Sequence, residues 1–136
     1  MRCNLSKFTE AELEYLKTQR LGRLATVNKR GEPQIAPVGF RYNAELDTID
    51  IGGHNIAASQ KFRNIARNGL AAFVVDDVQP PFIPRCIEIR GKAEVLSDGG
   101  QSIGPGFSPE FIRLTPKRII FADAVTGRPQ SARNVE

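Results

Sequence analysis

The stretch Ile87-Glu-Ile-Arg-Gly-Lys-Ala-Glu-Val95 decides the fold class, because apolar and charged side chains alternate along it. This period of two is typical of a β-strand with one face buried and the other face in water. The stretch therefore predicts a half-buried strand in a β-rich protein. Its inward positions are Ile87, Ile89, Ala93 and Val95, and its outward positions are Glu88, Arg90, Lys92 and Glu94.

On the N-terminal side of this strand, Leu70–Val75 is continuously apolar and ends at Asp76-Asp77. A short run of this kind predicts a fully buried strand. The prolines between Val78 and Pro84 then predict a loop that joins it to the next strand.

On the C-terminal side, a glycine-rich loop is expected from Asp98 to Pro109. Further strands are expected over Phe111–Leu114 and Arg118–Ala124, separated by Thr115-Pro116. The tail from Thr126 is expected to be extended.

Toward the N-terminus the sequence predicts a β-hairpin, with strands over Gly22–Val27 and Gln34–Tyr42 and a turn over Asn28–Glu32. Pro33 and Pro37 lie at or in the second strand. Because proline cannot donate to a strand ladder, we expect this strand to be an edge, bulged, or open on one side. Such a strand leaves backbone groups available to a ligand.

A third strand is expected over Asp47–Ile51, before Gly52-Gly53 ends it. The alternation along this strand predicts that Ile49 and Ile51 point inward and that Thr48 and Asp50 point outward.

Two helices are expected. Thr9 and Glu12 match the reciprocal capping pattern, so a short amphipathic helix should span Thr9–Thr18. In the middle of the chain, Ala58, Phe62 and Ile65 recur at helical spacing. For this internal helix Asn55 and Ser59 are both able N-caps, and Asn68-Gly69 supplies a stop.

These elements add up to about six or seven strands, one N-terminal helix and one internal helix. The connections are too short for most parallel crossovers, so the sequence predicts an antiparallel β-barrel or curled sheet in a mostly β protein. The length of 136 residues fits a single domain over residues 1–136.

The composition disfavours several classes of protein. With 40% apolar and 25% charged residues the chain is typical of a globular protein. No apolar run approaches a membrane span and no secretory signal is recognisable, so we expect a cytoplasmic location and no membrane partner. The net charge of +4 is spread along the chain, so no nucleic-acid partner is expected. Cys3 and Cys86 are too few for a metal cluster or a disulfide framework and are expected to be free thiols.

The junction between the third strand and the internal helix carries the candidate chemistry. From Ile51 to Val75 the sequence has no Asp or Glu, while Lys61 and Arg63 are present. Free N–H groups and the positive end of the helix dipole form an anion site at such a junction. Ser59 and Lys61 would complete it, through a hydroxyl donor and an ammonium group.

A second interpretation of the same junction stays open on the residues alone. Asn55 or Ser59 would then only cap the helix, and Lys61 and Arg63 would be solvated. His54 is the sole histidine and has no neighbouring Cys or acid in sequence, which disfavours a metal site or a catalytic triad.

Six segments of the chain occur in a characteristic order and spacing, namely Leu21–Val27, Gly31–Gln34, Pro37–Asn43, Thr48–Asn55, Lys61–Ile65 and Ile89–Glu94. Together they resemble the pyridoxamine 5'-phosphate oxidase-like (PPOX class) split β-barrel superfamily. Within it the chain is similar to the branch that uses the deazaflavin coenzyme F420. Gly39–Asn43 and Ile51–Asn55 further resemble a subgroup of actinobacterial dehydrotetracycline-type reductases.

The resemblance implies an FMN-binding-like split β-barrel and an F420-dependent oxidoreductase. Its reaction would transfer a hydride from the reduced deazaflavin to a conjugated C=C bond or a quinone-like group of a small-molecule substrate. No catalytic side chain is required, because a proton could come from water, Tyr42 or the substrate. The alternatives are an FMN-binding oxidase or reductase of the same fold, and a non-catalytic flavin- or deazaflavin-binding module.

The resemblance also assigns the residues of a phosphate site. In the superfamily a Ser-Arg-Lys sequence at the start of the internal helix holds the cofactor phosphate, and this chain has Ser59-Gln60-Lys61. Gln60 replaces the arginine. Arg63 is therefore the candidate to substitute for it, and Lys61 is the residue expected to bind the phosphate.

Further cofactor-binding residues follow from the same resemblance. Gly53, His54 and Asn55 would lie near the phosphate and the ribityl chain. Cys86 stands where flavin-binding oxidases of the family have a glutamine, which disfavours classical oxidase chemistry and makes Cys86 a wall residue. The strand alongside the ring would contribute Gln34, Pro37, Val38, Gly39 and Arg41.

Members of the resembled family form homodimers with the cofactor groove at the interface, so a homodimer is expected here. Arg128 and Arg133 in the C-terminal tail would either reach the partner's site or be solvated.

Overall fold

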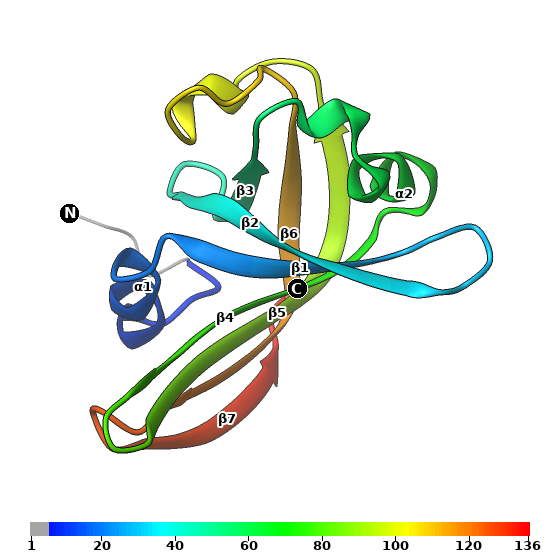
Figure 1. Cartoon of the computed structure of the whole chain (residues 1–136). Coiled ribbons are helices and arrows are strands. Elements are labelled where there is room, and N and C mark those ends of the chain that lie inside the picture. The colour runs from blue at the N-terminus through cyan, green and yellow to red at the C-terminus, as the bar shows by residue number, and fades with distance from the viewer. Residues whose placement is uncertain (1–5) are drawn as a thin grey trace.

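The computed structural model describes residues 6–136, so the expectation for Cys3 lies outside the described residues. The strands form one antiparallel sheet in the order β3-β2-β1-β4-β5-β6-β7, and it closes into a barrel because β3 also pairs with β6 (Figure 1). Strand β7 pairs with β6 outside this ring, and the expected mostly β fold is confirmed. The strands are β1 (Leu21–Val27), β2 (Pro33–Asn43), β3 (Thr48–Gly52), β4 (Leu70–Gln79), β5 (Ile83–Leu96), β6 (Phe111–Asp123) and β7 (Arg128–Asn134).

The helices are α1 (Glu10–Lys17) and α2 (Gln60–Asn68), with short 3-10 turns η1 (Ile56–Ala58) and η2 (Gly100–Ser102). Neither α-helix within residues 6–136 has the length and hydrophobicity that a membrane span requires. The apolar core lies inside the barrel, where neighbouring strands direct alternate side chains. Its fully buried members include Leu24, Ile49, Phe73, Ile89 and Ile119.

Helix α1 is capped as expected and is bound to the last strand. The Thr9 hydroxyl accepts a hydrogen bond from the Glu12 N–H at 3.2 Å, and the Glu12 carboxylate accepts one from the Thr9 N–H at 2.9 Å. The same carboxylate is only 1% exposed and accepts two hydrogen bonds from the Arg133 guanidinium at 2.7 Å. The extended tail is therefore a strand of the sheet, and Arg133 is bound to Glu12 and to the Lys7 carbonyl of its own chain.

Strand β3 corrects the expected alternation, because all its residues are buried, Thr48 and Asp50 included. Its position explains this: β3 is paired with β2 on one side and with β6 on the other. Asp50 is buried among partners, accepting hydrogen bonds from Arg113 at 3.0 and 3.1 Å, from Asn43 at 2.9 Å and from Thr48 at 3.0 Å.

Strand β4 runs on to Gln79 instead of ending at Asp76-Asp77. The prediction that its first half is fully buried is wrong, because Phe73 is buried while Leu70 is half exposed. An uninterrupted apolar run hides the period of two when apolar side chains occupy both faces. The expected loop over Val78–Pro84 is likewise shorter, because β4 and β5 pair up to Gln79 and Ile83.

The two strands expected around Thr115-Pro116 form a single strand, β6, with a bulge. The register shifts between Arg90 and Gly91, and Pro116 lies opposite Gly91. A Cβ atom at position 91 would lie 2.0 Å from the Thr115 carbonyl oxygen, so only glycine permits this approach. The bulge accommodates a proline that cannot donate to the ladder, and the strand continues beyond it.

The hairpin of β1 and β2 is confirmed, and so is the open side of β2. Residues 33–38 of β2 pair with β1 alone, whereas Gly39–Asn43 pair with β3. Pro33 and Pro37 both lie in the half that has a single neighbour. That half presents unpaired backbone groups beside the start of α2.

Candidate functional site

The junction after β3 forms a turn, η1 and then α2, and Ser59 is the N-cap of α2. The Ser59 hydroxyl oxygen accepts a hydrogen bond from the Phe62 N–H at 3.3 Å, and its proton is donated to the Ile56 carbonyl at 2.6 Å. Ser59 therefore caps the helix, as the second interpretation of this junction expects. Asn55 makes no side-chain cap; it adopts a left-handed conformation, with φ of 55°, that turns the chain into η1.

A groove of about 240 Å³ lies between the open half of β2 and the start of α2. Three of the predicted cofactor-binding residues line it together, namely Gln34 from β2 and Gln60 and Lys61 from α2. Ala36 and the buried Thr26 complete the wall from β2 and β1. The Lys61 ammonium has no hydrogen bond or ion pair to any residue in the described range. We call this cavity the edge groove.

A buried amide that was not among the predicted site residues, Asn64, holds the edge groove in shape. Asn64 is 1% exposed, and its NH₂ group donates to the Thr26 hydroxyl at 3.0 Å and to the Gln34 carbonyl oxygen at 2.8 Å. Its own oxygen accepts from the Gln60 amide at 2.8 Å. A polar residue on the inward face of an amphipathic helix was the signal that could have identified Asn64.

Arg63, the expected substitute for the missing arginine, does not line the edge groove. Its guanidinium donates to the Ala58 carbonyl at 2.8 Å and to the Gln60 side-chain oxygen at 3.0 Å. Gln60 is thus held from both sides, by Arg63 and by Asn64. Lys61 is the cationic side chain that the structure places in the groove.

A second group of predicted residues is fixed by the loop that follows β5. The His54 Nδ1 atom lies 2.8 Å from the Gly106 carbonyl oxygen, which can only accept, so Nδ1 carries the proton. The Ser108 N–H and hydroxyl both donate to the Gly53 carbonyl at 3.0 Å. Arg41 donates to the Ser102 hydroxyl at 3.1 Å. His54, Gly53 and Arg41 therefore hold the glycine-rich loop.

The loop also inserts Phe107 over the paired glycines Gly39 and Gly52. A Cβ atom at these positions would lie 2.9 and 2.8 Å from the Phe107 ring, so larger residues would displace it. The ring also meets His54 edge-to-face, with 5.2 Å between the ring centroids.

The remaining predicted residues are dispersed. Val38 is buried in the core, so it can offer only its backbone to a ligand, and Pro37 is exposed on the open half of β2. Cys86 lies opposite Asp76 on the outer part of the β4–β5 hairpin. Burial, followed by the charges of Asp76 and Glu88, raises the pKa of the Cys86 thiol, so this group stays protonated and is not an activated nucleophile.

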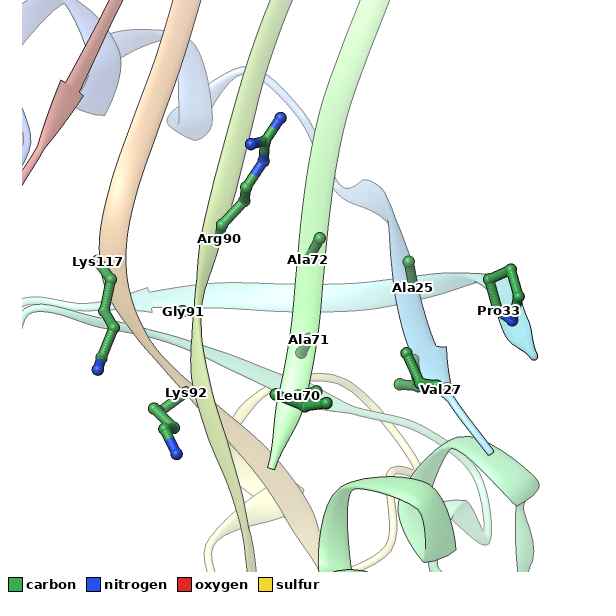
Figure 2. A pocket seen from close by; sticks show the side chains of 11 residues that line it. Ala25, Val27, Pro33, Leu70, Ala71, Ala72, Arg90, Gly91, Lys92 and Lys117 are labelled. Carbon is green, nitrogen blue, oxygen red and sulfur yellow. The ribbon is translucent and has the colours of Figure 1, made fainter. Parts of the chain in front are cut away.

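A larger cavity of about 440 Å³ lies on the outer face of the sheet (Figure 2). Ala25, Ala72 and Arg90 are cross-strand neighbours that share this face, while Leu24 and Phe73 point into the core. We call this cavity the outer groove. Sequence reasoning did not identify it, because its residues come from separate strands that only the register brings together.

Comparisons with known proteins show which family this chain resembles in sequence and fold. The chain is 45% identical over 115 residues to the 5a,11a-dehydrotetracycline/5a,11a-dehydrooxytetracycline reductase of Streptomyces rimosus, covering 83% of this chain and 81% of that protein. Among solved structures, a conserved hypothetical protein of Mycobacterium tuberculosis superposes with a TM-score of 0.69 at 18% identity, over 91% of this chain and 90% of that one.

A pyridoxamine 5'-phosphate oxidase-related, FMN-binding protein of Nostoc punctiforme superposes with a TM-score of 0.62 at 16% identity, over 88% of this chain and 81% of that one. Residues 8–104 match the sequence profile of the family described as pyridoxamine 5'-phosphate oxidase. This match spans most of the chain and includes both the edge groove and the His54 segment. The chain belongs to the pyridoxamine 5'-phosphate oxidase family of split β-barrels.

Proposed function

We propose that the chain is a coenzyme F420-dependent reductase that transfers a hydride to a conjugated C=C bond or a quinone-like group of a small molecule. Support comes from the Streptomyces rimosus relative, whose name describes a dehydrotetracycline reductase and which is 45% identical over 83% of this chain. A bound, reduced deazaflavin would supply the hydride. The observation that carries the proposal is the Lys61 ammonium at the start of α2, which has no hydrogen-bond or ion-pair partner within residues 6–136 and lies beside an open strand edge.

The start of α2 fits the phosphate of such a cofactor. Ser59 caps Phe62, which leaves the N–H groups of Gln60 and Lys61 without an intrahelical acceptor. Two N–H groups at the positive end of a helix, next to an ammonium, are the donors that a phosphate requires. Ser59 would hold the turn rather than bind the anion, because its proton is donated to Ile56.

The open half of β2 fits the ring of the cofactor. Residues 33–38 have a pairing partner on one side only, so their other backbone groups are free to meet polar atoms at a ring edge. Ala36 has a small side chain, so this wall of the groove leaves space for a ring. Asn64 holds Gln34 and Gln60 in fixed positions on the two walls, so the groove is preorganised for binding.

Tyr42 is not available as the proton source. Its hydroxyl donates to Asp47 at 2.5 Å. Burial raises the pKa of Asp47, but hydrogen bonds from the Lys7 N–H, Tyr42 and Ser6 outweigh it and lower the pKa below its usual value. Asp47 stays ionised and retains the Tyr42 proton, so we propose that water or the substrate supplies the proton.

We further propose a homodimer in which the second copy completes the cofactor site. The edge groove of about 240 Å³ is smaller than the roughly 300 to 1,000 Å³ of typical small-molecule sites. Cys86 lies on the β4–β5 hairpin and is not among the residues that line the edge groove, so it would face the groove of the second copy rather than its own. Exposed apolar residues on the same hairpin, Val78 and Phe82, suit contact with a second copy.

An FMN-dependent oxidoreductase is the second candidate, because the Nostoc punctiforme protein of the same fold is described as FMN-binding. The third is a module that binds a flavin or deazaflavin without turnover. A single domain and a cytoplasmic location remain expectations from the sequence.

Titration of the purified chain with F420 and with FMN, followed by fluorescence quenching, separates these candidates. Tighter binding of F420, together with oxidation of the reduced cofactor by a dehydrotetracycline, would support the proposal. Tighter binding of FMN would overturn the choice of cofactor. Binding of F420 without oxidation by dehydrotetracyclines or quinones would leave only the binding module.

A further inference from the structure

The outer groove has an apolar floor made of small residues. Ala25 and Ala72 are neighbours in the register of β1 and β4, and Gly91 lies on the next strand. Val27 and Leu70 supply larger apolar side chains at the margin. The volume of about 440 Å³ falls within the range of small-molecule sites.

One rim of the outer groove is basic. It is lined by Arg90, Lys92 and Lys117. Among the described residues, no Asp or Glu lines the groove. Arg90 is paired with Glu88, and Lys117 lies 3.4 Å from Glu136 in an exposed ion pair. Lys92 forms no ion pair or hydrogen bond with residues 6–136, so its charge is uncompensated.

The bulge in β6 places two of these cations together. Lys92 is paired with Thr115 and Gly91 with Pro116, so Lys117 is the extra residue of the bulged strand. A bulge redirects the side chain of its extra residue. Figure 2 shows Lys92 and Lys117 on the same side of the groove near Gly91, with Val27 and Pro33 at the opposite end.

We propose that the outer groove binds a planar apolar anion, such as an aromatic carboxylate. The flat body would lie on Ala25, Ala72 and Gly91, and the carboxylate would meet Lys92 and Lys117. From β6 to β1 the groove spans three inter-strand spacings, or about 14 Å, which suits a molecule of two or three fused rings. Thr26 lines both grooves, but Lys92 and Lys117 belong to the outer groove and Lys61 to the edge groove, so the proposed binding is independent of the proposed reduction.

A matched pair of probes tests the site. The full chain is titrated with 2-naphthoate and with the neutral 2-naphthalenemethanol, using the fluorescence of the naphthalene ring. We expect saturable binding of one naphthoate per chain, at least about tenfold tighter than the alcohol, because a charge-assisted hydrogen bond contributes on this scale.

Single substitutions then locate the bound anion. Lys92→Gln should weaken naphthoate binding about tenfold and leave the alcohol unchanged. Ala72→Leu should remove binding of both probes by filling the floor, and circular dichroism shows whether this variant is folded. Lys29→Gln, at an exposed turn residue, and Lys61→Gln, in the edge groove, should leave naphthoate binding unchanged.

Three outcomes would overturn the inference. Equal affinity for naphthoate and for the alcohol would show that the basic rim does not contribute to binding. Loss of naphthoate binding in Lys61→Gln would place the probe in the edge groove instead. If the wild type binds no naphthoate and Ala72→Leu changes a dimer to a monomer in sedimentation velocity, a second copy covers this face.

Discussion

Two polar regions of the barrel are built in opposite ways. Around Asp50, where β3 closes the ring against β6, the buried carboxylate has its hydrogen bonds supplied by Arg113, Asn43 and Thr48. At the edge groove, Lys61 has no partner among residues 6–136 and one half of β2 has no second neighbour. The comparison teaches that the polar groups that close the ring are satisfied within residues 6–136, whereas Lys61 and the open half of β2 are not, and we propose that a ligand satisfies these.

The largest expected effect lies on the closing side of this comparison. Asp50→Ala leaves the partly buried Arg113 without its carboxylate, which should lower the free energy of unfolding by about 3 to 5 kcal/mol. Urea denaturation measures this. The control Asp76→Ala breaks the exposed pair with Arg23 and should cost less than about 1 kcal/mol. Equal losses in the two variants would show that the Asp50 cluster does not hold the ring closed.

On the binding side, Lys61→Ala should weaken cofactor affinity by about 1.5 to 3 kcal/mol, the scale of a charge-assisted hydrogen bond. Its free energy of unfolding should stay within about 0.5 kcal/mol of the wild type, because the substitution breaks no hydrogen bond or ion pair within the described chain. Fluorescence titration and urea denaturation give the two values. Lys29→Ala is the matched control, and unchanged affinity in Lys61→Ala would remove the basis for the phosphate site.

Asn64→Ala should affect both sides of the comparison, because Asn64 is buried yet holds Gln34 and Gln60. The buried Thr26 hydroxyl loses its hydrogen bond from Asn64, which should cost about 1 to 3 kcal/mol of stability. Cofactor affinity should also fall in the folded fraction, since the walls of the groove lose their bridge. Asn134→Ala, which loses an exposed hydrogen bond to Arg118, is the control. A variant that loses stability and keeps full affinity would show that the bridge does not shape the site.

The smallest expected effect is a change of the free energy of unfolding with pH. Burial raises the pKa of Asp50, but hydrogen bonds from Arg113 and Asn43 outweigh it and lower the pKa below the usual value. Because the folded pKa is the lower one, this stabilisation is present above about pH 4 and is lost as the pH falls through the folded pKa. The stability difference between wild type and Asp50→Asn should therefore shrink below about pH 4. Denaturation at several pH values measures it, and a constant difference would contradict the assignment.

Elements with a local cause were predicted well from the sequence. The alternation from Ile87 to Val95 gave β5, the Thr9 and Glu12 pair gave the cap of α1, and Pro33 and Pro37 marked the open half of β2. Each of these rests on neighbours in the sequence, so no long-range information was needed.

Features that depend on long-range pairing were not predictable. Asp50 was expected in water, because the rule of alternation assumes one wet face and cannot foresee that β3 closes the ring against β6. Of the candidate site, the resemblance predicted Gln34, Gln60 and Lys61 among the cofactor-binding residues, and the structure places these three around one groove. It missed Asn64 and the outer groove, since their partners come from other strands and from a bulge at Pro116.

The open half of β2 has a consequence for how copies of the protein coexist at high concentration. An unpaired strand edge that carries Ile35, 70% exposed, is a template for strand-to-strand aggregation. Pro33 and Pro37 remove an N–H donor at each end of this edge, so a strand from another copy could not form a continuous row of hydrogen bonds with it. The same prolines that leave the edge open to a small ligand therefore protect it against uncontrolled polymerisation.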